Sequence, residues 1–458
     1  MAKPRILINM HYMALGGAER ALLGLLNALD PERVQVDLML NQHTGEFMPL
    51  IPSHVRLLPE QRGYNAIERP MRDIVREGQW RVALARLRAR CQHRRYLKTL
   101  TAQQRAYDAS IFQYVADCVT PVLPPIAEVS ESPYDLAISF LTPHNIVLDK
   151  VRAKKKIAWI HTDYSTIHVN AEKELRVWSR YDHIASISDD CTRSFLHTFP
   201  SLKDKIILIE NILSPTLVRQ QAMDDAHFDA APIGSADSEG TQTPPLTPPL
   251  CERGGEVETL GECNASEQTP PLAPPLCERG GEVMLLSVGR ISHAKNYDNI
   301  PDMARRMREL GLRFVWYILG PGNPDTINRK IAETGTADCV KLLGATSNPY
   351  PYIKACDIYV QPSRYEGKSV TVREAQILCK PVVITDYPTA RSQVQDGVDG
   401  IICPMDNASI ARAIADLAGD TARRQALSDY LAAHDYGNEA EVAKVYQLLP
   451  HQPTTPNA

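Results

Sequence analysis

The sequence predicts an α/β protein with two doubly wound, Rossmann-like domains that face each other across a cleft. Short apolar strands alternate with amphipathic helices near the start of the chain, and the same alternation begins again at Met284. A Pro- and Gly-rich stretch separates the two series. Such alternation is typical of parallel sheets covered by helices. Ligands of these sheets bind at the carboxyl ends of the strands, so site residues are expected there.

The first series opens with a strand, a glycine turn, a helix and a second strand. The turn contains Gly16 and Gly17, and the helix is expected over Ala18–Leu29. A right-handed crossover makes the flanking strands parallel. The strands of this series are predicted at Ile6–Met10, Val34–Leu40, Asp135–Phe140, Lys156–His161, His183–Ser188 and Lys205–Glu210.

The second series repeats this organisation with apolar runs of strand length between longer amphipathic segments. Strands are predicted at Met284–Val288, Phe314–Leu319, Val340–Leu343, Ile358–Gln361, Pro381–Thr385 and Gly400–Cys403. Helices are predicted at Asp298–Leu310, Thr326–Thr334, Val370–Cys379 and Ala408–Ala418.

A near-identical duplication lies between the two series. Gln242–Glu256 recurs at Gln268–Glu282 with one change, Thr247 to Ala273. Two copies rich in Pro and Gly cannot build a packed core. We therefore expect residues 224–282 to be a disordered linker insertion between the domains, and deletion of 240–282 to leave folding and activity largely intact.

Composition limits the class of protein. The chain has 458 residues, 44% hydrophobic content and a net charge of −4, so nothing global indicates nucleic-acid binding. Its ten cysteines include no Cys-x-x-Cys pair, which argues against a zinc site or a disulfide framework. The start reads as a first strand rather than a signal peptide, and no apolar run reaches the roughly 18 residues of a spanning helix. A cytoplasmic protein is expected.

One segment is strongly basic. Residues 69–98 contain ten Lys or Arg against two acids, with Trp80, Leu84 and Leu87 interleaved. Two interpretations remain open: a helix that lies on an anionic membrane surface, and a solvated helix flank.

Two glutamates, Glu366 and Glu374, flank the most informative loop of the chain. The loop follows a buried strand that ends at Pro362 and leads into a helix that begins near Val370. Free N–H groups and the helix dipole suit a phosphate there. Pro362 stands where a phosphate-loop NTPase needs glycine, so that class is excluded. A solvated charged loop is the ordinary alternative.

Other candidate residues also follow predicted strands. Gly17 permits close approach of a phosphate or sugar, although many such turns contain glycine. His161 can form hydrogen bonds in the cleft, although a lone histidine is more often structural. Arg290 and Lys295, five residues apart, suit a diphosphate, and a solvated loop is again the alternative. The chain has no Asp-x-Asp, so these cations are expected to neutralise a diphosphate leaving group without a metal.

Taken together, these motifs resemble the GT-B-fold retaining glycosyltransferases, and within them the chain is similar to glycosyltransferase family 4. The resemblance rests on Gly16–Glu19, on Val288–Asn296 with its Arg and Lys, and on Glu366 with seven residues before Glu374. It implies an N-terminal acceptor domain, a C-terminal nucleotide-sugar domain and metal-independent transfer with no cofactor. It also implies that a helix over Glu439–Leu449 returns to the first domain.

The resemblance further implies a role for each candidate residue. Arg290 and Lys295 would hold the diphosphate, and Val370 and Thr371 would offer it backbone N–H groups. Donor-sugar hydroxyls would contact Glu366, and the ribose would contact Glu374. Gly17 would line the acceptor-side loop, and His161 would lie near the transferred sugar. The loop keeps the first family glycine at Gly367 but departs from the family pattern at Lys368 and Ser369, where Lys368 adds a cation and a second glycine is missing.

We therefore predict a hexosyltransferase that uses a nucleotide sugar, with uridine diphosphate as the expected nucleotide, and a saccharide or lipid-linked acceptor in cell-surface polysaccharide synthesis. The basic stretch 69–98 favours an acceptor at the inner face of the cytoplasmic membrane. A GT-B nucleotide-sugar epimerase and a catalytically silent sugar-binding scaffold are the alternatives. The expected domains are 1–223 for the acceptor, 224–282 for the linker, 283–437 for the nucleotide sugar, and 438–458 for the returning helix and tail.

Overall fold

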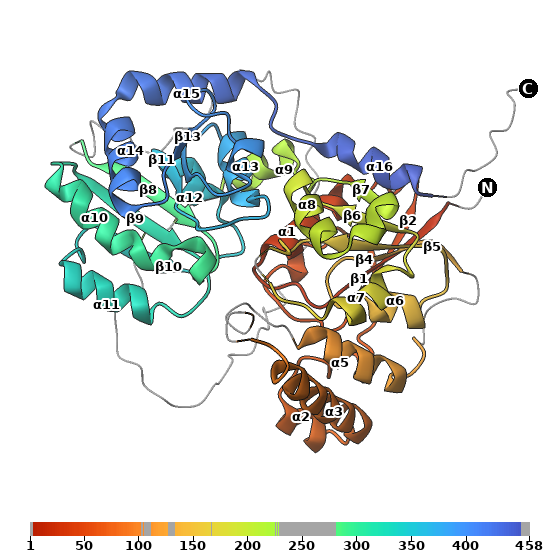
Figure 1. Cartoon of the computed structure of the whole chain (residues 1–458). Coiled ribbons are helices and arrows are strands. Elements are labelled where there is room, and N and C mark those ends of the chain that lie inside the picture. The colour runs from red at the N-terminus through yellow and green to blue at the C-terminus, as the bar shows by residue number, and fades with distance from the viewer. Residues whose placement is uncertain are drawn as a thin grey trace, which may run out of the picture.

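The computed structural model describes residues 3–449 apart from 102–103, 105–110, 127–132, 166, 225, 227 and 229–280. Within this part of the chain, two parallel sheets form two domains that lie side by side (Figure 1). The prediction of two doubly wound α/β domains is confirmed. Most of the expected insertion, 224–282, lies outside the described residues.

The first sheet has seven parallel strands in the order β3-β2-β1-β4-β5-β6-β7. Its strands are β1 Arg5–Met10, β2 Gln35–Leu40, β3 Arg56–Leu57, β4 Tyr134–Ser139, β5 Ala153–Ile160, β6 His183–Ser186 and β7 Ile206–Leu208. Helices of this half are α1 Gly17–Ala28, α2 Met71–Arg76, α3 Trp80–Leu97, α5 Phe112–Val119, α6 Asn145–Lys150, α7 Ala171–Trp178 and α8 Asp189–Thr198. Apolar clusters cover both faces of the sheet, as a doubly wound sheet requires.

The second sheet has six parallel strands in the order β10-β9-β8-β11-β12-β13. Its strands are β8 Val283–Val288, β9 Phe314–Leu319, β10 Val340–Gly344, β11 Ile358–Gln361, β12 Val382–Thr385 and β13 Ile401–Cys403. Helices of this half are α10 Ile300–Glu309, α11 Asp325–Thr334, α12 Tyr350–Ala355, α13 Val370–Ile377, α14 Asn407–Gly419 and α15 Thr421–Ala433. Two further apolar clusters cover this sheet.

The chain crosses between the domains at two neighbouring places. After Leu213 it enters α9, Pro215–Gln221, which packs with the core of the second domain through Val218. After α15 it returns to α16, Val442–Gln447, whose Val445 joins the core of the first domain. Figure 1 shows α16 beside the first sheet. The two crossings are joined directly, because Leu213 N donates to Asn438 Oδ1 at 2.8 Å.

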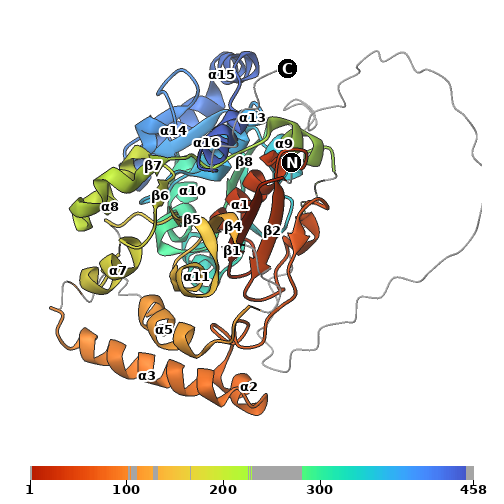
Figure 2. The same cartoon turned by 90° about the vertical axis from the view of Figure 1, so that its right-hand side faces the viewer.

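A helical layer extends the first domain on one side. α3 packs against α5 and α2, and Figure 2 shows it as the long helix at the edge of the molecule. Its buried face is small and apolar, with Val82, Ala83 and Ala89. Arg86 on that face donates to the carbonyl of Ala66 at 2.9 Å. Its opposite face is exposed to solvent.

Candidate functional site

A cavity of about 640 Å³ lies between the domains at the carboxyl ends of both sheets. The parallel topology of each sheet brings the loops after its strands to this place. Nine of the ten predicted site residues line the cavity: Gly17, His161, Arg290, Lys295, Glu366, Gly367, Lys368, Val370 and Thr371. The tenth, Glu374, does not line it.

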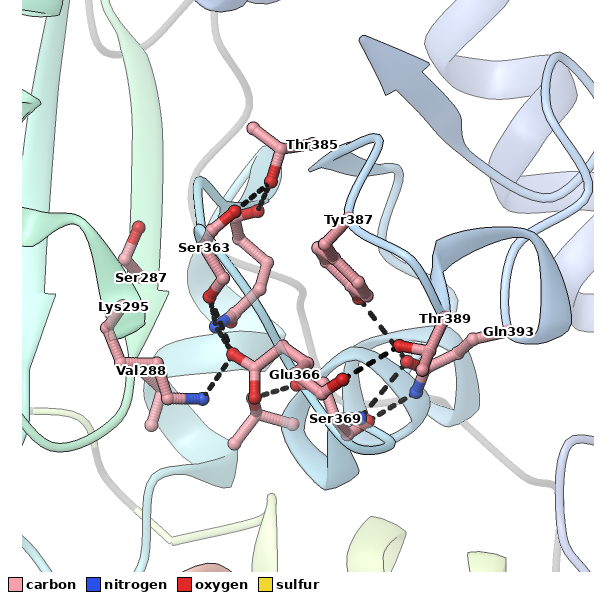
Figure 3. Close-up of polar contacts among 12 residues, drawn as sticks. Ser287, Val288, Lys295, Ser363, Glu366, Ser369, Thr385, Tyr387, Thr389 and Gln393 are labelled. Carbon is pink, nitrogen blue, oxygen red and sulfur yellow. Dashed lines mark hydrogen bonds and ion pairs between the residues drawn. The ribbon is translucent and has the colours of Figure 1, made fainter. Parts of the chain in front are cut away.

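Glu366 is the centre of the second-domain wall (Figure 3). Its Oε1 accepts hydrogen bonds from Lys295 Nζ at 2.6 Å and Ser363 Oγ at 2.6 Å. Gln361 Nε2 donates to the same oxygen at 2.8 Å. The Glu366 side chain is only 12% exposed. These contacts hold the Glu366 carboxylate and the Lys295 ammonium group side by side at the cavity.

The loop around Glu366 leaves backbone donors for a ligand. Ser369 caps α13 without a side-chain hydrogen bond, so the first-turn N–H groups at Val370 and Thr371 are not satisfied by that hydroxyl. Ser369 N donates to Gln393 Oε1 at 3.1 Å, which fixes the entry into the helix (Figure 3). The helix N-terminus therefore forms an anion-binding arrangement in the wall of the cavity.

Gly367 and Lys368 connect this loop to the first domain. A Cβ at Gly367 would lie 3.3 Å from Cys191 Sγ of α8, so glycine allows the close approach. Lys368 Nζ forms an ion pair with Glu210 Oε1 at 2.6 Å, and Glu210 lies just beyond β7. Lys368 therefore links the two walls as well as lining the cavity. Arg290 lies exposed at the rim.

Glu374 lies one helical turn below Val370 on α13 and is fully buried. Its Oε1 accepts hydrogen bonds from Tyr350 Oη at 2.9 Å and from Arg20 Nη1 at 3.2 Å. Arg20 belongs to α1 of the first domain. Among the described residues, the hydrogen-bond partners of Glu374 are thus an arginine and a tyrosine, and its contact with a ligand stays a prediction.

His161 lies directly after β5 with its ring against aromatic neighbours. The ring stacks on Trp159 with centroids 6.2 Å apart and packs against Phe140 at 4.6 Å. Burial lowers the pKa of His161 to about 3, so the imidazole is neutral at pH 7. Its buried Nε2 has no hydrogen-bond partner among the described residues. A neutral ring with a free nitrogen can form a hydrogen bond with a ligand but supplies no positive charge.

The first-domain wall contains acidic residues that the sequence did not single out. Burial raises the pKa of Glu19 and of Glu174, and both line the cavity. Tyr164 Oη donates to Glu174 Oε2 at 2.8 Å. Glu19 stands inside the glycine motif at the start of α1, and the motif itself predicts no role for this side chain. Glu174 lies on α7, which reads as an ordinary polar helix, so no pattern in the sequence marks it.

Two further observations concern the described part of the chain. No group of three or more His, Cys, Asp or Glu side chains is placed there to hold a metal ion. Among the helices described, none combines the length and apolar composition needed to cross a bilayer.

Two Rossmann-like domains with a cavity between the carboxyl ends of their sheets define the GT-B fold. Solved structures share it: the structure of Anabaena Alr3699/HepE in complex with UDP and glucose matches with a TM-score of 0.60 and 14% identity, covering 96% of this chain and 98% of that one. Sucrose-phosphate synthase from Thermosynechococcus elongatus matches with a TM-score of 0.61 and 13% identity, covering 97% and 98%. At these identities the likeness shows the fold alone.

The second domain also matches a named family. Residues 274–433 match the family described as "Glycosyl transferases group 1". An alpha-D-kanosaminyltransferase of Streptomyces kanamyceticus is 27% identical over 154 residues, which are 32% of this chain and 40% of that protein. The lipopolysaccharide core biosynthesis glycosyltransferase LpsE of Rhizobium meliloti is 24% identical over 177 residues, which are 37% and 50%. The matched regions thus span half or less of these relatives. The fold and the family match support a GT-B glycosyltransferase.

Proposed function

We propose that the protein is a retaining, metal-independent glycosyltransferase of family 4. It transfers a hexosyl group from a UDP-linked sugar to a saccharide or lipid-linked acceptor in the synthesis of a cell-surface polysaccharide. The observation that carries this proposal is the second-domain wall, where Arg290, Lys295 and the start of α13 converge on one cavity. Cations and helix N–H groups stabilise the charge that develops on a departing diphosphate.

Glu366 receives the role of sugar contact in this proposal. The hydrogen bonds that the described residues make to its carboxylate all reach Oε1. Oε2 is then the oxygen for a donor-sugar hydroxyl. His161 lies on the facing wall and offers a neutral nitrogen to the transferred sugar. Solved neighbours of this fold contain UDP and UDP-glucose, and relatives are named for lipopolysaccharide core and amylovoran biosynthesis. These names support the choice of donor and pathway class.

A nucleotide-sugar screen by thermal shift tests the donor. A bound ligand at about one hundred times its Kd stabilises the folded state by about 2.7 kcal/mol, so the cognate donor should raise Tm clearly. Arg290→Ala should remove the rise. Product analysis of the cognate donor then separates the alternatives: sugar release with retained anomeric configuration supports the transferase, an isomerised nucleotide sugar indicates an epimerase, and binding without turnover indicates a scaffold. No rise with any nucleotide sugar contradicts the proposal.

The α3 face supports a reaction at the inner surface of the cytoplasmic membrane. Trp80, Leu84 and Leu87 are each more than half exposed and lie on one side of the helix. Exposed arginines, including Arg81 and Arg88, flank this stripe. An exposed apolar stripe between cations suits the interface of an anionic bilayer.

Vesicle flotation tests this contact. The protein should float with vesicles that contain phosphatidylglycerol and remain unbound with phosphatidylcholine alone. Replacement of Trp80, Leu84 and Leu87 by serine should abolish flotation without lowering Tm, because the three side chains are exposed. Equal behaviour of the triple variant and the natural protein would leave α3 as a solvated helix.

A further inference from the structure

A largely buried arginine of the first domain holds a fully buried carboxylate of the second. Arg20 is in the first turn of α1, and its side chain is 13% exposed. Its Nη1 donates to Glu374 Oε1 at 3.2 Å and to Tyr350 Oη at 2.8 Å. Tyr350 Oη in turn donates to Glu374 Oε1 at 2.9 Å. The three groups form a closed set of hydrogen bonds across the domain interface.

Two aromatic rings fix the orientation of the guanidinium. The Arg20 Cζ lies 5.0 Å from the ring centroid of Phe47 and 5.2 Å from that of Tyr350. Stacking on rings and donation in the plane are properties of arginine that lysine lacks. This environment therefore selects a specific side chain rather than any cation, which a simple surface ion pair would not do.

One oxygen of the carboxylate is left over. Glu374 Oε2 is buried and has no hydrogen-bond partner in the part of the chain that the structure describes. A buried acceptor without a donor costs free energy, so a hydroxyl from a ligand would be a favourable partner. The place is suitable, because Val370 and Thr371, one turn above Glu374, line the cavity, and Arg20 lines it too.

We infer that Arg20 and Tyr350 are positioning residues that present Glu374 to the ribose hydroxyls of the donor nucleotide. The inference rests on the proposed function, in which a nucleotide sugar occupies the cavity. Because Arg20 comes from the first domain, the nucleoside site is complete only when both domains contribute to it. Nucleotide binding and contact between the domains are then linked, and each strengthens the other.

Nucleotide affinity measured by calorimetry tests the inference. Kd is determined for UDP and for its 2′,3′-dideoxy analogue with the natural protein, Arg20→Met and Tyr350→Phe. Another nucleoside diphosphate replaces UDP if the donor screen selects it. The natural protein should prefer UDP by about tenfold or more, as a hydrogen bond to a charged group implies. Arg20→Met should reduce this preference to about twofold, mainly by weakening UDP, and Tyr350→Phe should give an intermediate value.

Arg33→Met is the matched control. Arg33 also stacks on a tyrosine, with its Cζ 3.8 Å from the Tyr446 ring centroid, but it does not line the cavity. Its removal should leave the preference for UDP unchanged. If Arg20→Met does not fold, Arg20→Lys is used instead. Lysine keeps the positive charge but lacks the planar guanidinium that stacks on the two rings, so the preference for UDP should again fall.

The outcomes separate the two proposals. If Arg20→Met keeps the preference for UDP, even with a lower Tm, then Arg20 has only a structural role. That result overturns this inference and leaves the proposed function standing. Equal affinity of the natural protein for both nucleotides also overturns the inference and leaves the proposed function standing. Failure of the natural protein to bind any nucleoside diphosphate overturns the proposed function and the inference with it.

Discussion

The two walls of the cavity differ in charge. The second-domain wall presents the cations Arg290, Lys295 and Lys368, and the one carboxylate that lines it among the described residues, Glu366, is paired with Lys295. Apart from Arg20, which is paired with Glu374, the first-domain wall presents Glu19 and Glu174, whose carboxyl pKa values burial raises, together with a neutral histidine. A diphosphate is attracted by the cations of the first set and not by the carboxyl groups of the second. A donor can therefore be oriented by both walls, with its phosphates at the second-domain wall and its hydroxyl groups at the first-domain wall.

The largest expected effect comes from removing a cation of the second-domain wall. Lys295→Ala should lower kcat by about 10²–10³-fold, because a group that stabilises developing charge is lost. Turnover of the cognate donor under saturating conditions measures the effect. Arg313→Ala is the control, since Arg313 is exposed and precedes β9, at the opposite end of the sheet from the cavity. A loss of less than threefold in Lys295→Ala would remove the second-domain wall from the reaction.

A pH effect is expected from the first-domain wall. His161 in the unfolded chain has an ordinary pKa near 6.5, whereas burial lowers it to about 3 in the folded protein. Between these values the unfolded chain binds more protons, so stability falls as the pH falls from about 6.5. Full titration of one such group contributes a slope of up to about 1.4 kcal/mol per pH unit.

The slope is isolated by comparing the natural protein with His161→Gln. Denaturant unfolding at several pH values between 5 and 7 should show a shallower loss of stability in the variant, whatever its absolute stability. His144, whose pKa is lowered to about 3 chiefly by burial, remains in both proteins, so that only its smaller electrostatic coupling to His161 enters the difference. Identical slopes would mean that His161 is accessible and charged in the folded state.

The smallest expected effect concerns the link between the walls. The Lys368 and Glu210 side chains are 12% and 32% exposed, so their ion pair should contribute about 0.5–1 kcal/mol of coupling. A double-mutant cycle with Lys368→Met and Glu210→Gln, read by denaturant unfolding at low and high salt, measures this coupling. The pair Arg391–Asp386 is the control, because it is much more exposed and should couple less. If Lys368→Met loses donor affinity and shows no coupling to Glu210, then Lys368 contacts the donor and not Glu210.

Most of the fold could be predicted from the sequence because parallel buried strands read as continuous apolar runs. Phe314–Leu319 and Ile358–Gln361 match β9 and β11 residue for residue. By contrast, β3 has only two residues, which are too few to show the alternation or the apolar run by which a strand is recognised in a sequence. The packing of α9 on the second domain was also not foreseen, since Val218 has the same apolar character whichever core it joins.

The site divides in the same way. Residues that follow strands, such as Lys295 and Glu366, could be predicted because topology alone brings them to one edge. The partner of Glu374 could not, since Arg20 is 354 positions away and joins it only through the packing of two domains. Glu174 also gave no indication, because the burial that raises its pKa is a property of the assembled wall.

The hydrogen bond between the two segments that connect the domains has a consequence for how the chain is organised. The chain leaves the first domain near Leu213 and re-enters it near Asn438, and Asn438 Nδ2 also donates to the carbonyl of Asn211 at 2.9 Å. The intervening segment is therefore topologically an insert with adjoining ends, the arrangement that tolerates transplantation of a whole domain. Replacement of this segment by a short turn should leave a first domain with a continuous chain. A different domain could also be inserted at the same position without displacing Leu213 or Asn438.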